Sequence, residues 1–188
     1  VIAHEFFHAV QWASESFWIW DTGAWFWEAT ATWAAGEIVP EHDTYWNALP
    51  YYALKPQIGL YHDTMSEYGG APPDLHQYGA FIFARYISEI LEQPEIILSA
   101  WREGGTDEDP VAWMRMHMTD AHFGDALVGH AAHNLTWAYA DGERWSDWVD
   151  EVATWFPDED DRVAPLIEHE TEDWYTVSED DMPAAGGY

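Results

Sequence analysis

The stretch from His4 to His8, HEFFH, carries two histidines four residues apart and a glutamate, Glu5, directly after the first. On a helix, positions i and i+4 lie about 40° apart around the axis and one turn apart along it, so both imidazoles can point at one ion. Glu5 lies about 100° round from His4 and can reach a water at the open position of that ion. This spacing is typical of hydrolytic zinc sites, in which the glutamate takes a proton from the water.

Glu28 is the candidate for a third ligand, because a catalytic zinc is usually held by three protein side chains. It follows His8 by 20 positions, within WFWEATATW, in a segment predicted to be helical. Two helices packed across a turn would bring its carboxylate beside both histidines, whereas a separation above about 5 Å would contradict the site. We therefore expect His4, His8 and Glu28 to bind zinc. The alternative is a helix whose two histidines are surface residues or satisfied core residues.

Apolar periodicity and turn signals predict a mainly α-helical chain. Residues 40–73 carry five prolines and are expected to form a long loop region. We expect residues 1–145 to form a helical subdomain and residues 146–188 an acidic, partly β-stranded linker or the start of a following domain. In that tail, VAPLI and WYTV are β-like runs. The individual helices are predicted over residues 1–17, 25–39, 74–91, 94–102, 110–118 and 121–140.

Composition limits the classes of partner. Thirty-five Asp and Glu oppose six Lys and Arg, for a formal charge of −29, so nucleic acid is excluded as an expected partner. A charge of this size is best tolerated at high salt, and it resembles that of proteins from salt-adapted organisms. There is no cysteine, so a metal must be held by His, Asp or Glu, which are donors that suit zinc. No apolar run is long enough for a membrane-spanning helix, and we expect no membrane association.

HEFFH followed by Glu28 in WFWEATA resembles the gluzincins, the thermolysin-like zinc metallopeptidases. The patterns H-E-[FY]-F-H-A-x-Q and E-[AG]-T-A-T-W are similar, more narrowly, to those of a group of secreted microbial metallopeptidases. The resemblance covers residues 1–39 and, more weakly, residues 74–91. It implies the helical half of a thermolysin-like catalytic domain, a zinc cofactor, a peptide or protein substrate and an extracellular location. Because Val1 stands three residues before His4, we interpret the chain as a fragment without the upstream sheet of such a domain.

The resemblance also implies a tyrosine or histidine that donates a hydrogen bond to the oxyanion of the reaction. His76 and Tyr78, in LHQYGAFIFARY, are the candidates. The alternative is that Tyr78 is a core aromatic on an apolar helix face. Thr32, one turn after Glu28, falls where some gluzincins place an acid that orients a histidine, and a threonine cannot supply that carboxylate.

His130 and His133 form a second close pair, but no carboxylate has a matching position, so we interpret them as structural. The alternative function for the whole chain is a non-catalytic zinc-stabilised or carbohydrate-binding module. Trp25, Trp27 and Trp33 could stack on sugars, although we favour packing of the two metal-bearing helices. Four protein ligands would indicate a structural zinc, and three with an open position would indicate hydrolysis.

Overall fold

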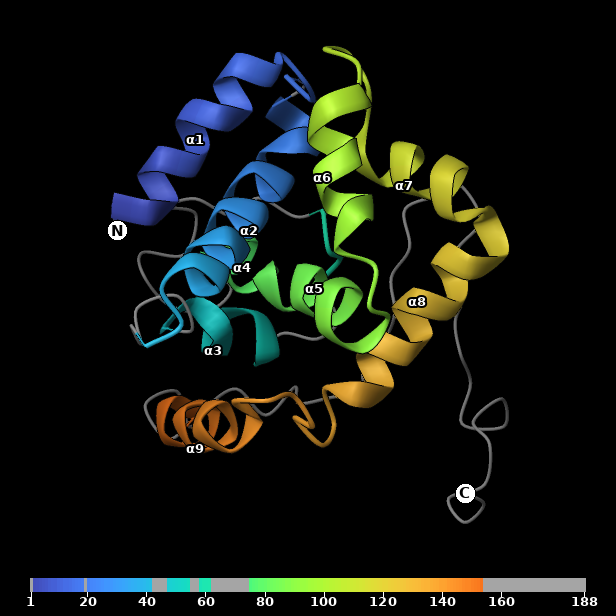
Figure 1. Cartoon of the computed structure of the whole chain (residues 1–188). Helices are drawn as coiled ribbons and strands as arrows, with labels where there is room; N and C mark the ends of the chain where they lie inside the picture. Colours follow the sequence, from blue (N-terminus) through green and yellow to red (C-terminus); the bar gives the residue numbers. More distant parts are fainter. Residues whose placement is uncertain (1, 19, 42–46, 55–57, 62–74, 154–188) are drawn as a thin grey trace.

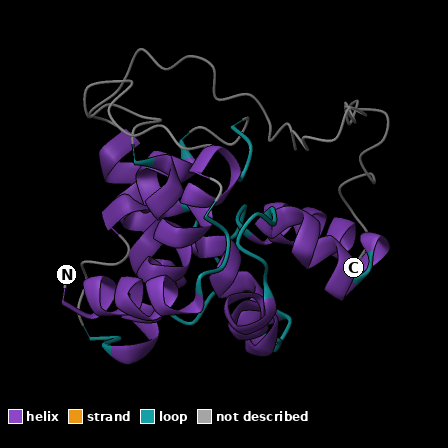
Figure 2. Ribbon diagram, turned by 90° about the horizontal axis from the view of Figure 1, so that it is seen from above, coloured by secondary structure: helices purple, strands orange, loops and turns teal. Residues whose placement is uncertain are grey.

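The structure is a computed structural model that describes residues 2–18, 20–41, 47–54, 58–61 and 75–153. Within these ranges the chain is mainly α-helical, which confirms the predicted fold class, and it contains no strand (Figure 2). The predicted β-like runs at 163–167 and 174–177 lie outside the described residues. None of the described helices is long and apolar enough to cross a membrane.

Helix α2 is at the centre of the arrangement and packs against α1, α4, α5 and α7 (Figure 1). Helix α8 follows α7 and packs on it, and α9 packs on α3. The described helices, in chain order, are α1 (Ile2–Ser14), α2 (Trp20–Ile38), α3 (Leu49–Ala53), α4 (His76–Gly79), α5 (Phe81–Arg85), the π-helix η2 (Tyr86–Ile90), α6 (Pro94–Glu103), α7 (Pro110–Met118), α8 (Asp120–His133) and α9 (Gly142–Ala153).

Aromatic side chains form much of the core around α2. Trp25, Trp27 and Trp33 are all buried, as the packing interpretation predicts. Trp101 of α6 lies edge-on to Trp27, with ring centroids 5.3 Å apart, and stacks on Phe26 at 5.2 Å. Such aromatic pairs add to the free energy gained from the buried area. They hold α2, the helix that carries Glu28, firmly against α6.

A tight turn brings α2 back alongside α1. Glu15 and Phe17 both have positive φ angles, 57° and 56°, which ends α1 sharply after Ser14. The backbone amide of Phe17 donates to the Gly105 carbonyl at 2.9 Å, which ties the turn to the loop between α6 and α7. A Cβ at Gly23 would lie 2.6 Å from the Phe17 carbonyl oxygen, so the close return of the chain requires glycine there. The turn therefore fixes α1, which carries His4 and His8, beside α2, which carries Glu28.

The outward face of α1 is apolar, while the face turned toward α2 is largely polar. Ile2, Phe6 and Val10 are exposed, with 87%, 67% and 47% of their surface accessible. The opposite face carries His4, His8 and the fully buried Gln11. Polar contacts to α2 therefore contribute to the orientation of α1 alongside the burial of apolar side chains.

Three predicted helices are divided or shortened, and the first of them, expected over 1–17, ends at Ser14. The helix expected over 74–91 is split into α4, α5 and η2, and in η2 the amide of Leu91 donates to the Tyr86 carbonyl, an i to i+5 bond that widens the last turn. The helix expected over 121–140 ends at His133. The amides of Thr136 and Trp137 both donate to the carbonyl of His133, which replaces the regular helical pattern by turns.

Three further boundaries differ from the predictions. The second helix begins at Trp20 rather than at residue 25. Helix α3 lies inside the expected loop region 40–73, with a proline in its first turn, where no helical hydrogen bond is lost. Helix α9 lies across the predicted domain boundary at 145/146 and buries Trp145 and Val149, so the described helices extend to Ala153, while the division into two regions stays a prediction. The rest of the predicted second region lies outside the described residues.

Candidate metal centre

His4 and His8 of α1 and Glu28 of α2 converge on one point. The Nε2 atoms of the two histidines are 3.0 Å apart, and the Glu28 Oε2 atom lies 3.1 Å from His4 Nε2 and 3.4 Å from His8 Nε2. Among the described residues, these three side chains form a group that could hold a metal ion. All three are partly exposed, so the group is reachable from solvent. The predicted ligand set is therefore brought together by the α1–α2 turn.

The second nitrogen of each imidazole is also engaged. His8 Nδ1 lies 2.6 Å from Gln11 Oε1, and His4 Nδ1 lies 3.3 Å from Thr32 Oγ1. Each ring is thus supported from behind, with its Nε2 directed toward Glu28. Metal-binding histidines commonly have such a partner, which sets the orientation and the tautomer of the ring. Thr32, which stands where the family resemblance implies an acid that orients a histidine, contacts His4 through a hydroxyl instead of a carboxylate.

The charges of the three side chains are coupled. The hydrogen bond with Glu28 raises the pKa of His8 above its ordinary value, against the lowering effect of burial. Burial alone would raise the pKa of Glu28, but the hydrogen bonds and charges of His4 and His8 outweigh it and lower that pKa to about 2. The carboxylate is therefore ionised at neutral pH, in the form that binds a cation. A metal ion would compete with protons on the histidines, because a metal ligand must give up its proton.

The other predicted site residues, Glu5, Tyr78 and His76, lie in different surroundings. Glu5 is exposed and lies outside the three-residue group, and its charge contributes to the raised pKa of His8. The ring of Tyr78 stacks on His4 with centroids 5.9 Å apart, so it borders the centre. His76 is fully buried and packs on Tyr52 at 4.7 Å. Tyr78 is therefore the better placed of the two candidate oxyanion donors.

Comparison with known proteins places the chain in a family. The model of a family described as "Family of unknown function (DUF6055)" matches residues 1–188. The chain belongs to the DUF6055 family. Searches of curated proteins and of solved structures gave no match. The geometry of the site is therefore the guide to the function of this family member.

Gln11 and Trp27 both contact His8, although sequence analysis predicted no role for either residue in the metal centre. Gln11 bonds His8, and the Trp27 ring stacks on His8 with centroids 6.3 Å apart. Gln11 follows His8 by three positions and His4 by seven, so it shares their helix face, which is the sequence signal that could have identified it. A polar residue at this position of α1 contacts the possible metal ligand His8 and is itself buried in the core.

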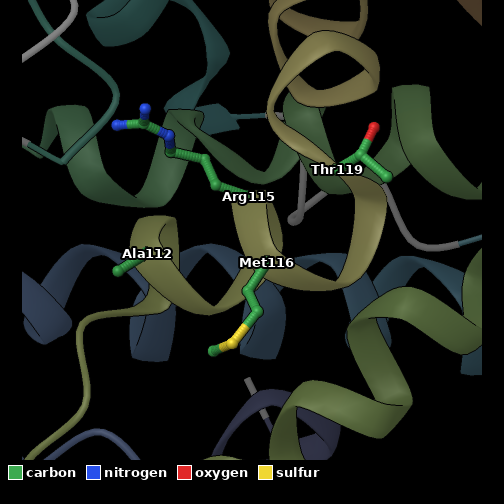
Figure 3. Close-up of a pocket in the computed structure, with 4 residues that line it drawn as sticks. All are labelled: Ala112, Arg115, Met116 and Thr119. Carbon is green, nitrogen blue, oxygen red and sulfur yellow. The ribbon is translucent and has the colours of Figure 1, made fainter.

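A hollow is formed by α7 and the residue that follows it, and not by α1 or α2, which carry the possible metal ligands. It is lined by Ala112, Arg115, Met116 and Thr119, with Arg115 and Met116 extending in different directions (Figure 3). None of these four residues belongs to α1 or α2 or to the group of possible metal ligands. The hollow therefore adds nothing to the chemistry of the centre.

Proposed function

We propose that this DUF6055 protein is a zinc-dependent hydrolase of peptide bonds, and that it acts on extracellular peptides or proteins. The observation that carries the proposal is the convergence of His4 Nε2, His8 Nε2 and Glu28 Oε2, with separations of 3.0, 3.1 and 3.4 Å. Glu5 adjoins this group within the H-E-x-x-H pattern, in which the glutamate serves as general base.

The donor set suits zinc. Donor atoms that each lie about 2.0–2.1 Å from a tetrahedral zinc ion are about 3.3–3.4 Å apart, which is close to the three observed separations. Two imidazoles and one carboxylate are also the donors found in a major class of catalytic zinc sites. Three protein donors leave one tetrahedral position for water or substrate. A zinc ion held here fits a catalytic role better than a closed structural one.

Each neighbouring side chain has a role in the proposed reaction. Bound zinc would supply Lewis acidity, which lowers the pKa of a bound water toward about 7. Glu5 would accept the proton of the attacking water and deliver it to the leaving amine. Tyr78, beside His4, would donate a hydrogen bond to the oxygen that gains negative charge when water adds to the peptide carbonyl. The exposure of Glu5 suits a residue that must meet the substrate.

The alternative of a carbohydrate-binding or purely zinc-stabilised module has less support. Trp25, Trp27 and Trp33 are buried, so the three tryptophans nearest Glu28 in the sequence do not form a sugar-stacking surface. Within the described part of the chain, the group of possible ligands has three members instead of the four of a closed site. Both observations favour an open, reactive centre.

The substitution Glu5→Gln tests the proposal. It keeps the size of the side chain and removes the base, so we expect hydrolysis of a peptide library to fall about 10²–10⁴-fold while zinc content is unchanged. The exposed Glu103→Gln, at the end of α6, is the matched control and should keep full activity. Tyr78→Phe should lower kcat about tenfold or more, in line with the loss of one oxyanion donor. If the Glu5 variant stayed fully active, the proposed mechanism would be wrong.

A further inference from the structure

Gln11 is fully buried on α1, three residues after His8, and its side-chain amide contacts three groups. Its Oε1 atom lies 2.6 Å from His8 Nδ1. Its Nε2 atom lies 2.9 Å from the carbonyl oxygen of Trp27 and 2.9 Å from Thr30 Oγ1. One buried amide thus joins a possible metal ligand on α1 to the backbone and side chains of α2.

The contacts determine which way the amide faces. The Trp27 carbonyl can only accept a hydrogen bond, so the atom facing it must be the NH₂ group of Gln11. Thr30 gives the same answer, because its hydroxyl donates to the Phe26 carbonyl at 2.6 Å and is left to accept from Gln11. The remaining amide atom, which faces His8, is therefore the oxygen. The orientation follows from two independent acceptors.

This orientation selects the tautomer of His8. The amide oxygen can only accept, so Nδ1 of His8 must carry a proton and donate it. In the neutral imidazole, the lone pair then belongs to Nε2, the atom that lies 3.0 Å from His4 Nε2 and 3.4 Å from Glu28 Oε2. A metal ion can bind only the nitrogen with the lone pair. Gln11 therefore directs the donor atom of His8 into the metal centre.

The support extends beyond α2. Trp101 of α6, itself 4% exposed, donates from Nε1 to Thr30 Oγ1 at 3.1 Å. Gln11 is thus held by a residue that is in turn held by a third helix. His4 has a different kind of partner, the hydroxyl of Thr32, whose Oγ1 atom lies 3.3 Å from His4 Nδ1. A hydroxyl can either donate or accept a hydrogen bond, so it selects no tautomer of His4. The rigid support in this centre is on the His8 side.

We propose that Gln11 is a positioning residue, which holds His8 in the tautomer that binds the metal and so sets the metal affinity of the centre. The inference rests on the proposed zinc function. Groups that orient metal-binding histidines in this way typically change metal affinity about 10–100-fold when they are removed.

Two substitutions separate this role from packing. Gln11→Met and Gln11→Glu both lose the amide donors to Trp27 and Thr30. Both variants should therefore have a lower melting temperature than wild type in metal-free buffer. Only Gln11→Glu keeps an acceptor for His8. We expect Gln11→Met to bind zinc about 10–100-fold more weakly than wild type, and Gln11→Glu to remain within about threefold of it, in competition with a chromophoric chelator.

The outcomes are distinct. If wild type binds zinc and Gln11→Met binds it equally tightly, or if both variants weaken alike, the positioning role is overturned and the proposed function stands. If wild type binds no zinc, the proposed function fails and this inference fails with it. If Gln11→Met does not fold, ¹⁵N spectra of metal-free wild type, recorded above the pKa of His8, still show which ring nitrogen of His8 carries the proton. A proton on Nδ1 of His8 supports the role, and a proton on Nε2 overturns it.

Discussion

Two pairs of histidines lie about one helical turn apart in this protein, and their surroundings differ in every respect that matters for metal binding. His4 and His8 are partly exposed, and both direct Nε2 at the carboxylate of Glu28. His130 is buried, and its Nε2 receives hydrogen bonds from the hydroxyl of Tyr52 at 3.0 Å and the amide of Asn134 at 3.1 Å. The lone pair that a metal would need is thus already used at the second site.

The second pair differs in its other member as well. His133 Nε2 lies 3.0 Å from the carbonyl of Ala138, a contact in which the ring must donate a proton. No carboxylate joins His130 and His133 in a group of possible ligands within the described chain. Helical spacing alone therefore does not make a metal site. The lone pairs must be free, they must converge, and a carboxylate must meet them.

The largest predicted contrast concerns metal affinity. Glu28→Ala should weaken zinc binding roughly 10²–10³-fold, because 10–16 kcal/mol of binding shared among about four ligands is about 2.5–4 kcal/mol for each. Isothermal titration with zinc measures this change. The matched control is Asp125→Ala, an exposed carboxylate on α8, the helix of the second pair, and it should leave the affinity unchanged. Equal effects of the two substitutions would remove the distinction between the pairs.

The second contrast concerns stability. His130→Ala should lower the free energy of unfolding by about 3 kcal/mol, because it leaves a cavity and removes the acceptor for Tyr52 and Asn134. Urea unfolding measures the loss, and zinc titration should show an unchanged affinity. His122→Ala, on the exposed side of α8, is the control and should change stability by less than about 0.5 kcal/mol. A loss of zinc binding in His130→Ala would show that the two pairs are coupled.

The smallest contrast concerns pH. Burial, and after it the charge of His133, lowers the pKa of His130 to about 3, whereas an unfolded histidine has a pKa of about 6.5. Between these values the unfolded chain binds a proton that the folded chain does not, so the stability contributed by His130 is complete above about pH 6.5 and is lost as the pH falls toward 3. From pH 7 to pH 5 the loss is about 2 kcal/mol.

Replacing His130 by Gln should remove that part of the pH dependence. Urea unfolding of metal-free wild type and His130→Gln at pH 7 and pH 5 measures it, and the metal centre, which both proteins share, cancels in the difference. Parallel pH dependences would mean that His130 is not held neutral in the folded protein.

The convergence of the three possible metal ligands could be predicted from the sequence because it depends on local rules. His4 and His8 share a helix face by their spacing alone, and Glu28 needs only a turn and a second helix to reach them. Asp109 is also predictable, since its side chain accepts from the Ala112 amide at the start of α7, as its position before a proline indicates. In each case the interaction is set within a few residues or by one helical hairpin.

The remaining features depend on contacts between distant segments. The role of Gln11 requires the Trp27 carbonyl at 2.9 Å, which no helical pattern reveals. The choice between His76 and Tyr78 depends on their surroundings, because both lie at the start of one short helix, where His76 is fully buried and Tyr78 stacks on His4. The end of α8 at His133 depends on Asn134 and the following turns, whereas the apolar pattern alone predicted a longer helix.

Anomalous diffraction at the zinc edge, from crystals grown with zinc, would show whether His4, His8 and Glu28 hold the metal. We expect one strong peak about 2.0–2.2 Å from His4 Nε2, His8 Nε2 and a carboxylate oxygen of Glu28, with no fourth protein donor and no peak at His130 or His133. A peak at the second histidine pair, a fourth protein ligand at the first, or no peak near Glu28 would contradict this expectation.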